Sequence, residues 1–255
     1  MAHRFDPTSL REYDIRGIVG KTLGMEDAKA IGRTFGTMIK RAGGARVATG
    51  YDGRVSSPML EAGLIEGLNE AGVDAVSVGL GPTPMLYYAA ATLDVDGGIM
   101  VTGSHNPPDY NGFKMVFQGR PFFGEDIQRL GHMSAEGDWE DGIGDQSAFD
   151  ILDEYVDRLL QGYDGGAFRI AWDAGNGAAG PAVEKLTAKL PGEHVLLYTD
   201  VDGDFPNHHP DPTEEKNLVD LRRVVKEQGL DFGIAFDGDG DRIGAIDGEG
   251  RIVWG

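Results

Sequence analysis

TGSHNPPDYNGFK, residues 102–114, is the stretch around which the rest of the chain is organised. Apolar runs lead into it, from Gly97 to Val101, and out of it, from Phe113 to Phe117, and both are predicted to be strands. The paired prolines and the glycines on either side of them exclude a helix, so a rigid loop joins the two strands. A loop of this kind holds a small polar side chain in a fixed place, and Ser104 is the natural candidate.

The hydroxyl of Ser104 can be phosphorylated, which adds about −1.5 to −2 charge and three acceptor oxygens. Lys114 is the last residue of the stretch, and its positive charge can pair with the negative charge of a phosphoserine. His105 does not indicate a hydrolase, because neighbours in an extended loop tend to point apart and no G-x-S-x-G elbow is present. An isolated serine is more often a turn or cap residue, so the interpretation depends on the whole stretch.

A second chemical stretch, DGDGDR at residues 237–242, follows the apolar run from Phe232 to Phe236. Aspartates at alternate positions, separated by glycines, let a tight loop turn all the carboxylates toward one point. A hard divalent cation with oxygen ligands relieves such crowding, and a plain acidic surface loop is the alternative. An EF-hand is excluded, because Arg242 and Gly248 occupy the positions that need Gly and Glu. The candidate metal ligands are Asp237, Asp239 and Asp241.

The composition limits the classes of partner. The formal net charge is −19, from 23 basic and 42 acidic residues, which argues against nucleic acid or an anionic membrane. Local cations or a metal can still bind a phosphorylated substrate. The absence of cysteine excludes disulfides and thiolate metal sites and suits a cytoplasmic protein. No apolar run approaches the ~20 residues of a membrane span, so we expect a soluble protein.

Strands and helices are predicted to alternate along most of the chain, which indicates an α/β fold with ligands at the carboxyl ends of strands. We predict two layered α/β domains, with mostly parallel or mixed sheets flanked by helices. The segment Gly137 to Asp150 is acidic and aperiodic, so we place the boundary there, giving domains 1–150 and 151–255. A further helix is predicted from Glu214 to Gln228, and the residues around Arg16 read as an exposed loop.

A rival interpretation comes from Gly175, Gly177 and Gly180, which spell G-x-G-x-x-G between a predicted strand and a helix. Asp200 lies at the end of the next predicted strand, where a dinucleotide-binding fold has its ribose-binding acid. Only 55 residues remain after it, too few for a second half-fold and a substrate domain. We therefore predict a tight structural turn, with an NAD-dependent oxidoreductase as the alternative.

The loop at 102–114 closely resembles the phosphoserine loop of the α-D-phosphohexomutases, specifically the phosphomannomutase/phosphoglucomutase group, whose pattern is TGSHNPxxYNGxK. The stretch at 237–242 resembles the metal loop of the same family, and REYDIRG at residues 11–17 resembles a third family segment. The resemblance implies that Ser104 shuttles a phosphoryl group between the 1- and 6-positions of a hexose phosphate. The sugar is expected to be mannose or glucose, and hexose 1,6-bisphosphate is the implied activator.

The resemblance also assigns roles to individual residues. It implies that Mg²⁺ is held by the three aspartates together with Ser104, and that Arg16 and Arg242 face the phosphoryl group. Lys114 is then a candidate for proton transfer, and His105 is included among the catalytic candidates. Tyr13 matches the tyrosine at the edge of the family's substrate cleft.

The resemblance covers the whole chain, but the chain covers only about half of the family's length. The sugar-recognition and phosphate-binding loops of the two C-terminal domains are not present here. We therefore expect the chain to be the N-terminal half of a larger enzyme and to be inactive alone. A non-catalytic phosphosugar-binding fragment is the remaining alternative.

Overall fold

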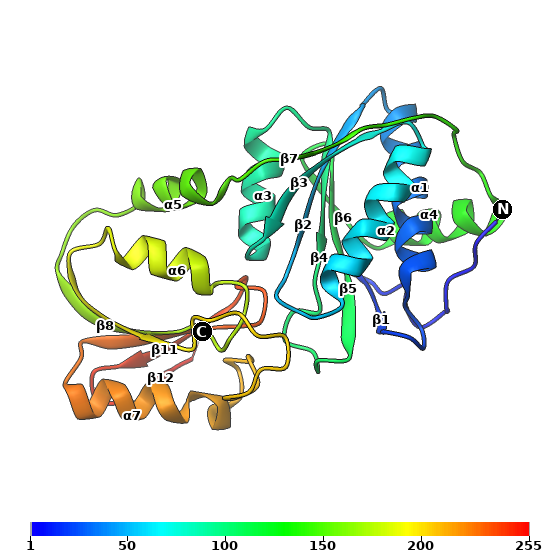
Figure 1. The fold of residues 1–255 in the computed structure, drawn as a ribbon. Helices are drawn as coiled ribbons and strands as arrows, with labels where there is room; N and C mark the ends of the chain where they lie inside the picture. Colours follow the sequence, from blue (N-terminus) through cyan, green and yellow to red (C-terminus); the bar gives the residue numbers. More distant parts are fainter. Residues whose placement is uncertain (1, 255) are drawn as a thin grey trace.

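The computed structural model describes residues 2–254 and contains two β-sheets, each flanked by helices (Figure 1). The first unit, residues 15–148, builds a seven-stranded sheet, and the second unit, residues 168–253, builds a five-stranded sheet. Helix α5, Leu152–Leu160, connects the two units along the chain and lies beside α6, Gly180–Thr187, in Figure 1. The predicted α/β class with two layered sheets is confirmed. Among the described residues, none of the helices is long and apolar enough to cross a membrane.

The strands of the first unit are β1 (Ile15–Ile18), β2 (Arg46–Tyr51), β3 (Asp74–Leu80), β4 (Gly97–Val101), β5 (Tyr110–Phe117), β6 (Arg120–Phe122) and β7 (Gln146–Ala148). Its helices are α1 (Met25–Arg41), α2 (Ser57–Glu70), α3 (Thr83–Thr92) and α4 (Glu125–Glu136). The second unit contains β8 (Phe168–Asp173), α6 (Gly180–Thr187), β9 (Gly192–Leu197), η1 (Glu215–Leu218), α7 (Val219–Gln228), β10 (Phe232–Phe236), β11 (Ile243–Asp247) and β12 (Ile252–Val253).

The first sheet has the strand order β1-β5-β4-β2-β3-β7, with β6 paired to β5. Strands β2, β3, β4 and β7 are parallel, whereas β1, β5 and β6 run antiparallel to their neighbours. Successive side chains of a strand point to opposite faces, so Val47 packs with the core under α1 and α2 while Ala48 packs with α3. Helices therefore cover both faces of the central strands.

The second sheet has the order β12-β11-β10-β8-β9, in which β8, β9 and β10 are parallel. Ala171 of β8 packs toward α7, and the next residue, Trp172, packs toward α6. The serine loop leaves the carboxyl end of β4, and the aspartate loop leaves the carboxyl end of β10. The two loops meet closely, because a Cβ on Gly238 would lie 2.4 Å from the carbonyl oxygen of Ser104.

Three local predictions differ from the structure. The helix predicted from Glu214 is a 3₁₀ turn at Glu215–Leu218 followed by α7, which begins at Val219. The segment predicted to be aperiodic contains β7, which pairs with β3 through three exposed residues, too few to show a period. Arg16, predicted to be exposed, is only 8% exposed because β1 pairs along β5.

Candidate functional site

Ser104 is held in an unusual backbone conformation and is almost completely buried. Its φ angle is 49°, in the left-handed region, and its exposed fraction is 1%. The N–H of Ser104 donates to Thr102 Oγ1 at 2.8 Å, and its carbonyl oxygen accepts from Arg54 Nη2 at 2.7 Å. Thr102 within the loop and Arg54 outside it therefore fix this serine on both sides.

The aspartate loop brings three carboxylates to the serine. Ligand oxygens of Asp237, Asp239 and Asp241 all lie within 4.8 Å of one another. The Ser104 hydroxyl donates to Asp237 Oδ2 at 2.8 Å. Lys114 Nζ donates to Asp239 Oδ2 at 2.7 Å and to Asp241 Oδ2 at 2.5 Å. Two stretches more than 100 residues apart in the sequence thus form one cluster.

The donor set of this cluster fits a divalent cation. One oxygen of Asp239, Oδ2, accepts hydrogen bonds from Lys114 and from the Thr83 hydroxyl. The other, Oδ1, is buried and has no hydrogen-bond partner among residues 2–254. A buried carboxylate oxygen without a partner is costly, and a metal ion bound there would satisfy it. Carboxylate and hydroxyl oxygens are also the ligands that Mg²⁺ prefers.

Burial and crowding shift the ionisation of the cluster. Burial, together with the charges of Asp239 and Asp241, raises the pKa of Asp237 to about 7. Burial would raise the pKa of Asp239 as well, but Lys114 and Thr83 outweigh it and hold this pKa at about 2. Burial opposes the charge of Lys114, yet the two aspartates raise its pKa above the usual value, so the ammonium form persists.

The raised pKa of Asp237 predicts that this residue's contribution to the stability of the metal-free protein is lost as the pH rises from 5 to 8. Between the unfolded pKa near 3.8 and the folded value of about 7, the folded state binds more protons, so the free energy of unfolding falls with pH. The three-unit shift sets an upper limit of about 4 kcal/mol on this loss. Urea denaturation in the presence of a chelator measures it.

Asp237→Asn is the matched control for this prediction, because it removes the titrating group and keeps the shape. The variant should lose less stability over the same pH range, and added Mg²⁺ should reduce the loss in the parent protein. Asp239, with a pKa of about 2, titrates below the range and does not interfere. Parallel pH profiles for the parent and Asp237→Asn would contradict the assignment.

A cleft of about 340 Å³ lies in front of the cluster. Its walls include Tyr13, Arg16, Ser104, Lys114, Asp241 and Arg242. Tyr13 is 77% exposed and stacks on Phe123 at the cleft, with ring centroids 6.3 Å apart. Arg16 pairs with Asp14, and its Nε has no hydrogen-bond partner among the described residues. The predicted site residues therefore line this cleft or lie next to residues that do.

The sequence suggested that the side chains of His105 and Ser104 point apart, and this is wrong. Its Nδ1 lies 3.2 Å from Ser104 Oγ and 3.0 Å from Arg242 Nη1. The left-handed turn at Ser104 brings these neighbouring side chains to the same side of the loop. Burial, with the charge of Arg242 second, lowers the pKa of His105, so its ring is neutral at physiological pH.

His208, His209, Gly177 and Gly180 of the second unit make contacts that stabilise the fold. His208 Nε2 contacts Asp173 Oδ2 at 2.9 Å, and His209 Nε2 lies 2.6 Å from the His105 carbonyl oxygen. A Cβ on Gly177 would lie 2.8 Å from the Gly238 carbonyl, and one on Gly180 would lie 1.9 Å from the Thr199 carbonyl. Close backbone packing accounts for these glycines without a dinucleotide.

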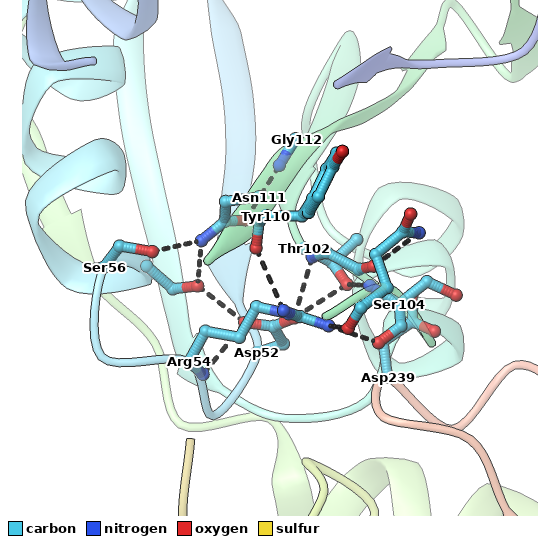
Figure 2. A network of polar contacts seen from close by, with 12 residues as sticks. Asp52, Arg54, Ser56, Thr102, Ser104, Tyr110, Asn111, Gly112 and Asp239 are labelled. Atoms are coloured by element: carbon cyan, nitrogen blue, oxygen red, sulfur yellow. Dashed lines mark hydrogen bonds and ion pairs between the residues drawn. The ribbon is translucent and has the colours of Figure 1, made fainter. Parts of the chain in front are cut away.

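Residues that the sequence analysis missed support the two loops from behind. Asp52 and Arg54, to which the sequence analysis assigns no role, belong to the buried polar network behind the serine loop (Figure 2). Thr83, at the start of α3, donates its backbone N–H to the Asp239 carbonyl at 2.7 Å in addition to its side-chain contact. The sequence did contain a signal for Asp52 and Arg54. They are a charged pair directly after strand β2, and functional residues in α/β folds often lie at the carboxyl ends of strands.

Comparison with known proteins gives matches along nearly the whole chain. Residues 7–140 match the family model described as phosphoglucomutase/phosphomannomutase, alpha/beta/alpha domain I, and residues 153–250 match the corresponding domain II. A phosphomannomutase/phosphoglucomutase from Pseudomonas putida is 47% identical over 245 residues, covering 96% of this chain and 53% of the relative. A phosphoglucomutase from Neisseria meningitidis serogroup A is 43% identical over 252 residues, covering 96% and 54%.

A solved structure gives the same result for the fold. The crystal structure of a phosphoglucomutase/phosphomannomutase family protein from Burkholderia thailandensis matches with a TM-score of 0.95 and 44% identity. That match covers 98% of this chain and 57% of the solved chain. The chain spans about half the length of the curated relatives it matches.

Proposed function

Because this chain belongs to the phosphoglucomutase/phosphomannomutase family, we propose that it supplies the phosphoryl-transfer centre of a hexose-phosphate mutase. The reaction moves a phosphoryl group reversibly between the 1- and 6-positions of mannose or glucose phosphate. The observation that carries this proposal is the 2.8 Å contact between Ser104 Oγ and Asp237 inside the carboxylate cluster. It supports the proposal because a hydroxyl that can be phosphorylated lies within hydrogen-bond distance of a candidate metal ligand.

In the first step, the free hydroxyl of the hexose phosphate attacks phosphorus on phosphorylated Ser104. The bond between phosphorus and Ser104 Oγ breaks, and a new phosphorus–oxygen bond to the sugar forms, giving a hexose 1,6-bisphosphate. The sugar hydroxyl loses its proton, and Ser104 Oγ gains one. After the bisphosphate turns over in the site, the reverse step returns the other phosphoryl group to Ser104.

Positive charge around Ser104 favours this transfer, because the transferring phosphoryl group spreads negative charge over its oxygens. We assign this role to Arg16 and Arg242, which line the same cleft. Asp237, Asp239, Asp241 and Ser104 would hold Mg²⁺. When bound, the ion supplies charge neutralisation and polarises the phosphoryl oxygens. Tyr13, exposed at the cleft, is assigned to contact the sugar.

Two residues are candidates for handling the proton. His105 is neutral and its Nδ1 lies 3.2 Å from Ser104 Oγ, so it can accept a proton near the reacting oxygen or return one to it. Lys114 has a raised pKa and stays protonated beside the aspartates. We therefore assign Lys114 to stabilise negative charge or donate a proton to the departing oxygen.

The activity requires more than this chain. The relatives are about twice as long, and we propose that further domains grip the sugar and its second phosphate. Within the chain, we propose residues 1–150 as the phosphoserine domain and 151–255 as the metal-loop domain. Hexose 1,6-bisphosphate is the proposed activator, since it can load Ser104. Formation of hexose 6-phosphate from mannose 1-phosphate or glucose 1-phosphate by the longer protein, meaning this chain together with the proposed further domains, tests the proposal.

Asp239→Asn should weaken Mg²⁺ binding to this chain at least ~10-fold, because it removes one of three ligand charges and replaces one carboxylate oxygen with an amide NH₂ group that cannot bind a cation. Isothermal titration calorimetry measures the affinity. Asp220→Asn is the matched control, because Asp220 is hydrogen-bonded to Tyr198 at 2.8 Å and lies outside the cluster. Unchanged Mg²⁺ affinity in Asp239→Asn would show that the aspartates form only a solvated turn.

A further inference from the structure

The serine loop rests on a buried ion pair that none of the proposed chemical steps uses. Asp52 and Arg54 follow β2, are each 1% exposed, and face each other with Arg54 Nε 3.3 Å from Asp52 Oδ2 (Figure 2). Burying an arginine and an aspartate is costly, and such pairs contribute little net stability compared with apolar packing. We propose that this pair positions Ser104 for phosphoryl transfer, an inference that rests on the proposed function.

Arg54 holds the serine loop through its carbonyl groups. Its Nη2 donates to the carbonyl oxygens of Ser104 at 2.7 Å and Asn106 at 2.6 Å. Its Nη1 donates to the carbonyl oxygens of Pro107 at 2.6 Å and Tyr110 at 2.9 Å. The planar guanidinium presents its donors in a fixed fork, so these four contacts fix the shape of the loop. A lysine cannot reproduce them.

Asp52 holds the other side of Ser104 through Thr102. Asp52 Oδ2 accepts from the Thr102 hydroxyl at 2.9 Å and from the Gly103 N–H at 3.0 Å. The Thr102 oxygen in turn accepts the N–H of Ser104 at 2.8 Å. The peptide groups before and after Ser104 are therefore both tied to one ion pair. This accounts for a non-glycine residue at a φ of 49°, which costs free energy unless its surroundings impose it.

Neighbouring residues leave space for this ion pair or form hydrogen bonds with it. A Cβ on Gly103 would lie 2.3 Å from Arg54 Nε, so glycine leaves the space that the guanidinium fills. Ser57 donates to Asp52 Oδ1 at 2.6 Å and accepts from Asn111 Nδ2 at 2.8 Å. Asn111 lies in β5, the strand that follows the loop, and Thr102 lies at the beginning of the loop. Through Ser57 and Thr102, the ion pair therefore connects both ends of the loop to the start of α2.

The proposal makes Arg54 a positioning residue, and it predicts a local effect of Arg54→Lys. Amide hydrogen exchange in peptides covering residues 102–112 should become at least ~10-fold faster, while exchange in α1 stays at the parent rate. A residue that merely stabilised the whole unit would raise both rates together. Arg169→Lys is the matched control, because Arg169 also donates to backbone carbonyls, those of Gly229 and Gln228, but far from the loop.

The longer protein provides a second readout. Arg54→Lys should lower kcat at least ~100-fold, since small misplacements of reacting groups cost rate on this scale, and leave KM within about twofold. The exchange measurement does not require turnover, so a failure of the proposed function, with no activity in any variant, can be distinguished from a failure of this inference.

Thr102→Val is the second variant, in case Arg54→Lys does not fold. It keeps the contacts of Arg54 and removes the hydroxyl that links Asp52 to the Ser104 amide. It should also increase exchange in residues 102–112 and lower kcat with little change in KM. Parent-like exchange in the loop of either folded variant, or exchange that rises equally in α1, would overturn the proposal.

Discussion

Ser104→Ala in the longer protein should lower mutase turnover by at least ~10⁴-fold and leave the fold intact. The variant has no oxygen to receive the phosphoryl group, and loss of a covalent nucleophile is among the largest single-residue effects in enzymes. The alanine fits the site, because it only removes the hydroxyl that donates to Asp237. A coupled assay for hexose 6-phosphate, with pure hexose 1,6-bisphosphate supplied as activator, measures the loss.

Ser147→Ala is the control for that experiment, because Ser147 lies in the exposed strand β7. It should retain parent turnover. Circular dichroism and thermal unfolding should be alike for the parent and both variants. Near-normal turnover of Ser104→Ala would remove this serine from the mechanism, whatever the position of the aspartates.

The second large effect concerns residues 1–255 as an isolated chain. The chain should fold and bind Mg²⁺, yet show no measurable conversion of glucose 1-phosphate to glucose 6-phosphate. Its cleft would present the proposed phosphoserine, but the residues that grip the sugar and its distal phosphate are assigned above to the proposed further domains. Positioning contributes up to roughly 7–11 kcal/mol to a transfer barrier where it is ideal, so its loss costs many orders of magnitude in rate.

Calorimetry with Mg²⁺ and circular dichroism are the controls, because they show that an inactive chain is folded and metal-competent. Adding the proposed further domains, produced separately, should restore some turnover by reassembly with this chain. Robust turnover by residues 1–255 alone would show that the site is complete within this chain and that the proposed architecture is wrong.

The two loops that form the candidate site could be predicted from the sequence, because each is a short, continuous stretch. Ser104 stands in a loop whose prolines and glycines exclude regular structure, and the alternating aspartates can turn their carboxylates toward one point. The structure brings these two stretches within hydrogen-bond distance. The alternation of strands and helices was also sufficient to predict the α/β class.

The supporting groups could not be predicted, because their contacts join distant segments. Arg54 acts on carbonyl oxygens about 50 residues further along the chain, and Thr83 contacts Asp239 more than 150 residues away. Backbone carbonyls leave no trace in the side-chain pattern, so nothing in the sequence marks them as partners. The exposure of Arg16 was misjudged for a similar reason, since its burial depends on pairing between β1 and β5.

The most direct test of the central claim is to locate the phosphoryl group. The longer protein is incubated with Mg²⁺ and a hexose 1,6-bisphosphate whose phosphoryl oxygens carry oxygen-18, quenched during turnover, and mapped by peptide mass spectrometry. We predict one labelled phosphoryl group per molecule, on Ser104, which is lost when unlabelled hexose monophosphate is added. Turnover with an unlabelled Ser104, or with the label on another residue, would contradict the account.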